Sequence, residues 1–541
     1  MTKRNPKPID PAALAQARTA LAQARGKRRL DLVLDQPDPG ALVRALPADD
    51  LYLTIREVGL ADAVELVQLA SADQFRTFLD LAAWSGDHVD PRRALPWLRA
   101  ARAGSTDSPG AAARWKTKLA RLDLELLNLV LGDTLRVHDL DQDPDPLIES
   151  DRFMRTPENR FVVEFLADGA EYVAVRGLVD DLYAEDPFKA TRLLSSLRFE
   201  LPSELEETAL RWRTGRLADL GYPSREEALS WFAKPAARPA PPAGAPARPV
   251  GFFLERLGQG SLLARAAGRL QPDERVHLEL ELVTAANAVL VADAVDPGDL
   301  EAARSAVEAA RALVELGLEA AAGADEARAA EVLASTAVKA LFQRGFGRVL
   351  ELRWRAERLL ASGRAGTREA PLLDPPLGEM LSALAARRPR YFPGLEVPRE
   401  EWGTLAAGAF EPRAFLSSAE VTRTAEALTL AEGLAAVGEE LALRRPADLA
   451  GPLAPRLAAL YLTALANERL GRRFAPEPIP AAELPAAAAA LAPLDDPRLA
   501  SAGDAGALLA SMARTRGEEL VPLREGASTR PEHVAALLVR P

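Results

Sequence analysis

The segment from Leu42 to Trp84 most constrains what this chain can fold into, because it contains four short apolar stretches at helical spacing, each closed before the next begins. Asp38 and Pro39 are typical of a helix N-terminus, and Pro47 ends the first stretch. Gly59 ends the second, since glycine is common just past a helix C-terminus. Each stretch predicts a helix of roughly two to three turns, too short to persist alone in water.

Apolar side chains recur at helical intervals through the remaining stretches. The second follows the acidic pair Asp49 and Asp50, which suits the positive end of a helix. The fourth begins with Ser71 and has Gln74 three residues later, the pattern of a capping box. The apolar positions are Leu51, Ile55 and Val58 in the second stretch, Leu60, Val64 and Val67 in the third, and Phe75, Phe78 and Leu79 in the fourth. Short helices with one apolar face must pack on neighbours, so the segment predicts a repeat-like superhelical stack.

Two resemblances extend this prediction. The phrase LPADDLYLTIREVGLADAVELVQLASADQFRTFLDL (46–81) resembles the superhelical cytosolic N-terminal domain of MgtE-type magnesium transporters, which also joins short helices opened by Leu-Pro and Asp. The sequence shows neither transmembrane channel segments nor a recognisable paired CBS module, so this resemblance does not imply transport. The whole chain also resembles a bacterial family of unknown function, most clearly in RFELPSELEETALRWRTGRLADLGYPSREEAL (198–229) and HLELELVTAANAVLVADAVDPGDLEAARSAVEAA (277–310). That resemblance implies a bacterial origin and a shared fold.

Composition narrows the class of protein. A chain of 541 residues predicts two to four domains, and its abundant Ala, Leu, Arg and Glu are strong helix formers. The net charge of −11 disfavours a nucleic-acid-binding protein, which usually has a basic domain. The absence of cysteine excludes disulfides, thiolate zinc sites and cysteine nucleophiles, and it fits the cytosol. The sequence has no uninterrupted run of about 18 apolar residues, so no membrane-spanning helix is predicted. We expect a cytoplasmic protein.

The predicted fold is mainly α, in four parts. Residues 1–30 form a basic arm, residues 31–232 a helical-repeat-like domain, residues 233–249 a Pro- and Ala-rich linker, and residues 250–541 an all-helical domain. A small antiparallel β insertion is expected near 134–166, because LRVHDL alternates like a strand and RFMRTPENRFVVEFL predicts two strands around a turn. The linker composition favours extended polyproline II, and a plain linker is favoured over a ligand for an SH3-like partner.

Helices are expected elsewhere along the chain. A loop-rich passage is expected at 362–400, and the alanine-rich run 481–492 is either helical or loosely ordered. One long helix from Ser108 and Pro109 through Leu129 is predicted. Two helices within 326–360 are expected to be interrupted at Gly345-Phe346-Gly347. The other predicted helices are 91 onward after Asp90, 169–184, 186–198, 203–218, 278–295, 299–322, 417–443, 452–471 and 503–516.

Two sets of residues resemble metal ligands, but neither has the full pattern of a metal site. Asp139, Asp141 and Asp143 have the spacing of a calcium loop, but Pro144 replaces its glycine and Ser150 its bidentate Glu. An acidic surface loop over 139–151 is therefore favoured, with weak divalent-cation binding as the alternative. The histidines, His88, His138, His277 and His533, lie far apart in sequence. His277 and Glu281 share a helix face, where an ion pair explains them without a metal.

Three further patterns are candidate binding features. Gly258-Gln259-Gly260-Ser261 and Gly345-Phe346-Gly347 lack the residues and spacing of a phosphate loop, and neither G-x-S-x-G nor H-E-x-x-H occurs. The helix 203–218 could present a binding face, although i, i+4 ion pairs more often support a solvated helix. Its residues are Arg211, Trp212, Arg213 and Arg216, opposite Glu204, Glu206 and Glu207. The basic arm, Lys3, Arg4, Lys7, Arg18, Arg25, Lys27, Arg28 and Arg29 against Asp10, is interpreted as a solvated terminus rather than a tether to nucleic acid or membrane.

These observations predict a non-enzymatic protein-interaction, regulatory or scaffold protein whose partner is another protein. No catalytic, cofactor-binding or metal-binding residue is predicted, and no cofactor. The alternative is an enzyme whose site is assembled from scattered carboxylates and arginines. A deep pocket holding an acid–base pair with perturbed pKa values would favour the enzyme, whereas shallow or groove-like surfaces would favour binding.

Overall fold

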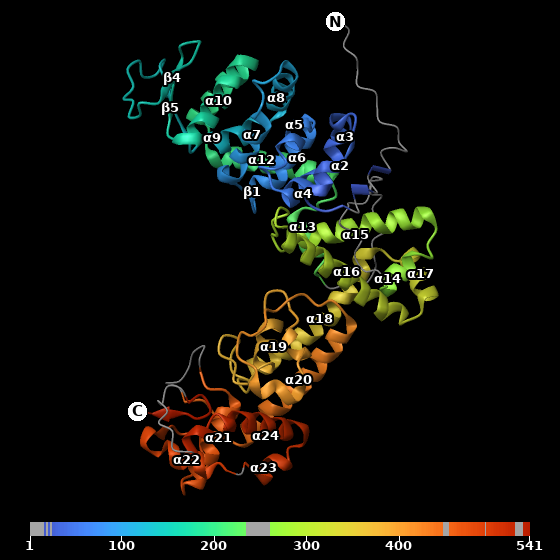
Figure 1. Cartoon of the computed structure of the whole chain (residues 1–541), viewed down its shortest axis with the longest axis vertical. Helices are drawn as coiled ribbons and strands as arrows, with labels where there is room; N and C mark the ends of the chain where they lie inside the picture. The colour runs from blue at the N-terminus through green and yellow to red at the C-terminus, as the bar shows by residue number, and fades with distance from the viewer. Residues whose placement is uncertain are drawn as a thin grey trace. The chain divides into compact units, whose positions relative to one another are not determined.

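The computed structural model describes residues 16–17, 20–21, 24–233, 260–446, 454–492, 494–524 and 534–540. Within them the fold is mainly helical with small β-sheets, which confirms the predicted class (Figure 1). The linker predicted at 233–249 and most of the basic arm lie outside the described residues, so their interpretation stays a prediction. The chain divides into two compact units: unit 1 is Met1–Ala233, Arg238–Arg311 and Glu326–Lys339, and unit 2 is Lys234–Ala237, Ala312–Asp325 and Ala340–Pro541.

Unit 1 begins with the predicted series of short helices. After α2 (Lys27–Leu34) come α3 (Pro39–Ala45), α4 (Ala48–Val58), α5 (Val64–Leu69) and α6 (Ala72–Ala82), which are the four expected stretches. Their ends are the predicted ones. The Asp38 side chain accepts from Ala41 N, Gly59 follows α4 with a φ of 103°, and Ser71 and Gln74 form the capping box.

The short helices are held together by a common core and by buried polar anchors. Tyr52, Phe78 and Trp97 are buried against one another, with the Tyr52 and Trp97 rings stacked at 5.4 Å between centroids. Gln74 is also buried, and its Nε2 donates to the carbonyls of Val43 and Leu46, each at 2.8 Å. One side chain thus satisfies the carbonyls at the end of α3, which the helix itself leaves open.

The helix predicted from Pro109 through Leu129 is two helices, so this prediction was wrong. α7 (Pro91–Arg102) is followed by α8 (Pro109–Arg121) and α9 (Leu124–Leu131), because the chain is extended at Leu122. Lys189 Nζ donates to the carbonyls of Leu119, Ala120 and Leu122 at 2.8–3.1 Å. The Lys189 side chain, about seventy residues away in sequence, therefore satisfies the carbonyls that a further helical turn would otherwise have bonded.

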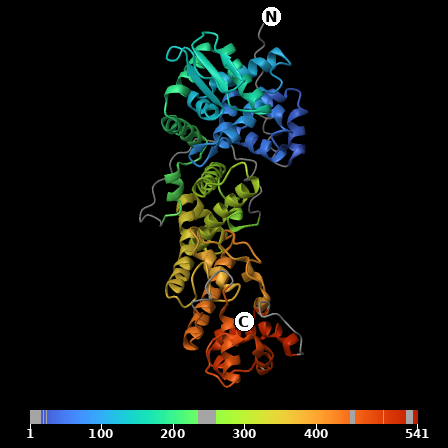
Figure 2. The ribbon, with the colours of Figure 1, turned by 90° about the vertical axis from the view of Figure 1, so that its left-hand side faces the viewer.

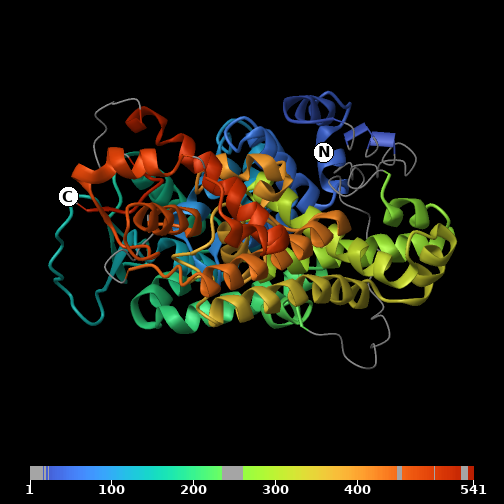
Figure 3. The same ribbon diagram turned by 90° about the horizontal axis from the view of Figure 1, so that it is seen from below.

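The predicted β insertion is a three-stranded antiparallel sheet, preceded by the two-residue pair β1 (Trp84–Ser85) and β2 (His88–Val89). Its strands are β3 (Leu135–Asp139), β4 (Phe153–Arg155) and β5 (Phe161–Phe165), in the order β3-β5-β4 with Val137 opposite Val163. Figure 2 shows these strands, in cyan to teal, at one side of the helices of unit 1. The segment that joins β3 to β4 extends outward from those helices in Figure 3.

The remaining helices of unit 1 follow the predicted ranges closely. α10 (Gly169–Glu185), α11 (Pro187–Phe199) and α12 (Pro202–Asp219) each match within about one residue, and α13 (Arg225–Ser230) was not predicted. α14 (Leu262–Ala267), α15 (Pro272–Ala292) and α17 (Glu326–Ser335) complete the unit with part of α16 (Leu300–Ala322). The break between the helices predicted at 278–295 and 299–322 is present at Asp296-Pro297-Gly298, and the Gly298 carbonyl accepts from Arg56 Nε at 3.1 Å.

In unit 2, α16 and α18 (Val338–Ala361) cross with their backbones in contact. A Cβ added to Gly345 would lie 1.9 Å from the Leu313 carbonyl oxygen, and one added to Gly317 would lie 1.9 Å from that of Leu341. The predicted interruption at Gly345-Phe346-Gly347 was therefore wrong, because α18 runs through it and the break lies before Val338. Gly345 serves the crossing and does not end a helix.

The rest of unit 2 packs around the buried helix α21 (Leu457–Arg469). Helices α20 (Ser418–Glu440) and α24 (Gly503–Glu518) were predicted, whereas α19 (Leu377–Leu384) lies inside the passage expected to be loop-rich. The other elements are η1 (Pro393–Glu396), η2 (Arg399–Thr404), η4 (Ala481–Glu483), α22 (Leu484–Ala490), α23 (Pro497–Ala500), α25 (Val521–Arg524) and the parallel pair β6 (Ile479–Pro480) and β7 (Val539–Arg540). The alanine-rich run 481–492 is therefore largely helical.

Candidate functional site

The described part of unit 1 contains an open apolar groove of about 860 Å³, which we call the α7 groove. Three elements form its walls, and Figure 1 labels their helices. The α5 side contributes Leu60, Ala61 and Val64, α7 contributes Leu95, Pro96, Leu98, Arg99, Ala100 and Arg102, and α10 contributes Ala170, Val173, Ala174 and Leu178. Ala103, Gly104, Ser105 and Thr106 close one end.

The C-terminal half of α10 is clamped to α7 and α8 by one carboxylate. Asp181 Oδ2 accepts from Arg102 Nε at 2.6 Å and from Trp115 Nε1 at 2.7 Å. The guanidinium of Arg102 lies directly on Gly177, where an added Cβ would be 2.5 Å from Arg102 Cζ. Gly177 is therefore needed for the side chain that fixes this end of the groove.

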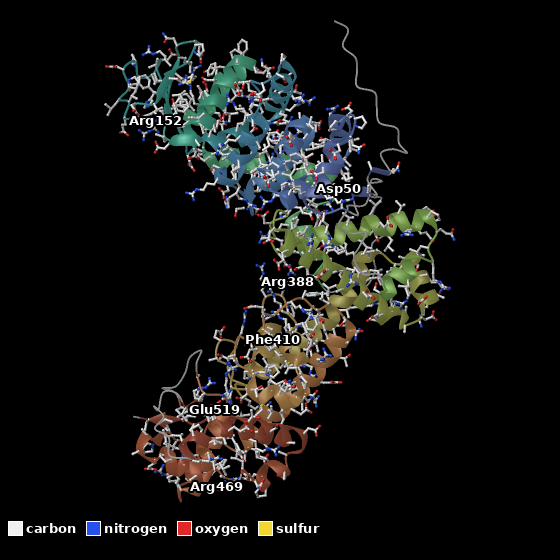
Figure 4. The ribbon with its side chains drawn as sticks, in the orientation of Figure 1. Asp50, Arg152, Arg388, Phe410, Arg469 and Glu519 are labelled. Atoms are coloured by element: carbon white, nitrogen blue, oxygen red, sulfur yellow. The ribbon has the colours of Figure 1, made fainter. Side chains whose placement is uncertain are left out.

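The start of α10 is held from the other side, by the β-sheet. Arg152, labelled in Figure 4, donates to the Ala167 carbonyl at 2.9 Å and pairs with Asp168, the residue before α10. The Arg176 guanidinium lies over the Phe165 ring of β5 at 5.5 Å. α10 is thus positioned by polar contacts toward both of its ends, which leave Ala170 and Val173 exposed.

The stripe of α10 that faces the groove is apolar and open. Ala170, Val173, Ala174 and Leu178 recur at i, i+3, i+4 and i+8, the spacing of one helix face. Leu178 is buried at the floor, but 63% of Val173 is exposed. An exposed aliphatic stripe is ordinarily buried against a neighbour, so this face has the character of a binding surface.

The only charges in the lining are positive. Of the described residues that line the α7 groove, none is acidic, whereas Arg99 and Arg102 are both present. Asp181 neutralises Arg102, but no acidic side chain in the described part of the chain pairs with the exposed Arg99. The groove therefore combines an aliphatic floor with one free cation on its rim.

The acidic loop 139–151 is organised by a residue that the sequence analysis did not single out. The buried carboxylate of Glu164 accepts from the N–H groups of Glu149 and Ser150 at 2.8 and 2.5 Å. Burial acts to raise its pKa, but these bonds and one to His138 hold the pKa of Glu164 below its ordinary value. Glu164 thereby fastens the loop to β5.

The three aspartates at calcium-loop spacing are not gathered into one cluster. Asp139 and Asp141 lie toward Arg160, at 3.4 and 3.8 Å, and Asp143 accepts from Asp145 N. Within the described ranges, no group of three or more His, Asp or Glu side chains could hold a metal ion.

The histidines that the structure describes lie beside separate carboxylates. His88 Nδ1 is 3.0 Å from Glu206, His138 Nε2 is 3.2 Å from Glu164, and His277 Nε2 is 3.8 Å from Glu281. The last is the i, i+4 pair that the sequence predicted. His533 lies outside the described residues, as do Gly258 and Gln259 of one glycine motif, whereas Ser261 caps α14.

The residues of the candidate binding face on α12 lie in two environments: some make partly buried contacts with the rest of unit 1, and others are exposed to solvent. Arg216 pairs with the buried carboxylate of Asp80 through two bonds of 2.7 and 2.8 Å, and Arg213 donates to the Asp80 carbonyl. Arg211 makes the expected exposed ion pair with Glu207, and Trp212 is exposed. The arginines are thus not gathered into one binding face.

The deeply buried acids bear on the enzyme alternative. Burial raises the pKa of Asp80 and of Asp374, against the opposing charges of Arg216 and Arg516 respectively. Asp374 Oδ2 also accepts from Ala458 N at 2.8 Å. Both carboxylates are enclosed, and neither is among the residues that line the α7 groove.

Lys118 is a buried cation on α8. Its Nζ donates to the Gln68 carbonyl at the end of α5, at 2.9 Å, and its side chain is 1% exposed. Burial lowers the pKa of Lys118 to about 8, and the positive charges of Arg114 and Arg44 act in the same direction. The ammonium thus completes the C-terminus of α5 at an electrostatic cost.

Sequence reasoning missed the α7 groove, although one signal was present. The buried stripe of α10 includes Val175, Leu178, Val179 and Leu182. Ala170, Val173 and Ala174 widen that stripe beyond what one packed face requires. An apolar face wider than one packing contact requires indicates a second apolar contact. The sequence does not show that α5 and α7 face this side of α10, because both lie far away along the chain.

The class of protein follows from these features: a mainly helical protein with an apolar surface groove in unit 1. No helix in the described part of the chain is long and apolar enough to cross a membrane. The chain belongs to the family of unknown function DUF6178, whose model matches residues 6–522. This confirms the resemblance to a family of unknown function over nearly the whole chain. No curated protein and no solved structure matches the chain.

Proposed function

We propose that this protein is a non-enzymatic interaction protein and that the α7 groove is where it binds another protein. The observation that carries the proposal is the open aliphatic stripe of α10 facing α5 and α7, with Val173 63% exposed. Burying such a stripe contributes about 25 cal/mol per Å² of apolar surface, which favours association with a partner. The cysteine-free composition fits an interaction in the cytoplasm.

Rigid support of the groove also favours this role. The clamp at Asp181 and the contacts of Arg152 hold α10 in place without covering its stripe. A partner would then bind a preformed surface and would not have to order it, which lowers the entropic cost of association.

Co-purification from native cells tests the proposal. We expect Val173→Glu to abolish recovery of a protein partner that the wild-type chain retains, because the carboxylate would be desolvated in the complex. Val276→Glu is the matched control, since Val276 is an exposed valine of α15 outside the groove. Equal recovery with both variants, or no partner recovered by the wild-type chain, would contradict the proposal.

A further inference from the structure

We propose that the occupant of the α7 groove is one amphipathic α-helix of a protein partner, with aliphatic side chains on the groove floor and a carboxylate on Arg99. This inference rests on the proposed function and adds the chemistry of the partner. Size, backbone access and charge support it.

The size of the groove suits a short helix. A helix about 10 Å wide that rises 1.5 Å per residue occupies roughly 120 Å³ per residue. The groove volume of about 860 Å³ therefore encloses roughly seven helical residues, or about twice that number for a helix sunk to half its width. Two to four turns of helix would present apolar anchors at i, i+3, i+4 and i+7.

Small side chains let a helix backbone approach closely. Ala61, Ala100, Ala103, Gly104, Ala170 and Ala174 all line the groove. The distance between packed helix axes depends on the side chains at the contact, and small ones permit the nearest approach. An enclosed pocket for a small molecule would cover its ligand, whereas the exposed Val173 marks a surface trough.

Charge identifies the partner as acidic along this helix. Of the described residues that line the groove, none carries a carboxylate, and no acidic side chain in the described part of the chain pairs with Arg99. An ion pair at a rim adds little affinity, at most about fivefold, but it selects partners and sets register.

The same charge argument disfavours two of the chain's own segments as occupants, the basic arm and the Pro- and Ala-rich linker. The arm at residues 1–30 is strongly basic, and residues 233–249 carry Lys234, Arg238 and Arg248 without any acid. Both would be repelled by Arg99, and the second has no apolar periodicity.

A helical peptide library displayed against the full-length protein tests the inference. Apolar residues are fixed at i, i+3, i+4 and i+7, the other positions are drawn from Glu, Lys, Gln and Ala, and Val173→Glu serves for counter-selection. We expect enrichment of Glu over Lys. The best peptide should bind Arg99→Glu about tenfold more weakly than wild type, as measured by fluorescence anisotropy. Selection on Arg99→Glu should shift toward Lys.

Arg92→Glu is the matched control, because Arg92 is an exposed arginine of α7 outside the groove, and it should change affinity less than twofold. Enrichment of Lys, absence of a charge preference, or an equal effect of Arg92→Glu would overturn the inference. It would also be overturned if no groove-dependent peptide is selected while the fluorescent acyl probe cis-parinarate binds wild type and not Val173→Glu. The co-purification experiment stands apart from these results, since a partner lost with Val173→Glu could still lack acidic residues.

Discussion

Apolar helix faces are closed at one place in this protein and open at another. They are closed at the crossing of α16 and α18 in unit 2, and open at the α7 groove of unit 1. At the crossing, Gly317 and Gly345 bring two helices into backbone contact and leave no room for a methyl group. At the groove, α10 is fixed at both ends by polar contacts while Val173 remains largely exposed. One region uses small residues to close a contact, and the other uses them to keep a surface accessible.

The difference indicates how to tell structural from functional apolar surface in a helical protein. Glycine and alanine at a closed contact are constrained by an atom at close range, as Gly345 is by the Leu313 carbonyl. Small residues along the groove have an open side. Substitutions at closed positions should therefore change stability, and substitutions at open positions should change binding.

The largest expected effect comes from Gly345→Ala. Its Cβ would lie 1.9 Å from the Leu313 carbonyl oxygen, so the helices must separate, at a cost of about 3 kcal/mol. Gly347→Ala is the control in the same helix. No atom lies within 4 Å of its Cβ position, and we expect a gain of about 0.5–1 kcal/mol from reduced backbone entropy. Urea unfolding midpoints of the two variants measure this, and a similar midpoint for both would refute the close crossing.

Gln74→Ala is expected to cost about 3 kcal/mol, because it removes partners from three backbone groups near the start of α6 and the end of α3. These groups are the Val43 and Leu46 carbonyls and the Ser71 N–H. Gln36→Ala is the control, since Gln36 is exposed, and it should change stability by less than about 0.5 kcal/mol. If thermal denaturation gave equal Tm values for both variants, Gln74 would not be an anchor of the stack.

Lys118 should make the free energy of unfolding of unit 1 depend on pH in a distinctive way. The folded state releases this proton near pH 8 and the unfolded chain near 10.5, so unfolding takes up a proton between these values. The contribution of this group to stability therefore rises from pH about 8 to 10.5, by roughly 3 kcal/mol in all. Lys118→Met should lose this rise and Lys116→Met, at an exposed position of α8, should keep it. Identical urea midpoints against pH for Lys118→Met and wild type would contradict a buried, charged Lys118.

The sequence predicted what depends on local chemistry. The cap at Asp38, the glycine stop at Gly59 and the capping box of Ser71 and Gln74 each involve neighbours within four residues, and all are present. The alternation in LRVHDL likewise placed β3 correctly. Local rules were sufficient wherever an element is defined by its own residues.

The sequence-based predictions were wrong where contacts between residues far apart in sequence determine the structure. Lys189 satisfies the end of α8 and permits the break at Leu122, which no local signal shows. Gly345 looks like a helix stop until Leu313 is known to lie against it. The α7 groove is of the same kind, because its walls are assembled from α5, α7 and α10. Only the surplus apolar width of α10 was visible in advance.

The smallest expected effect on stability is that of Val173→Glu, less than about 0.5 kcal/mol, since the side chain is exposed. Its effect on partner binding should nevertheless be the largest, so position 173 best separates an effect on binding from an effect on stability. The most direct measurement is photo-crosslinking in native cells, with a benzophenone amino acid placed at position 173 or, as the control, at position 276. We predict a discrete protein adduct from position 173 and none from position 276. Adducts of equal yield from both positions, or none from position 173, would contradict the account of the α7 groove as a protein-binding site.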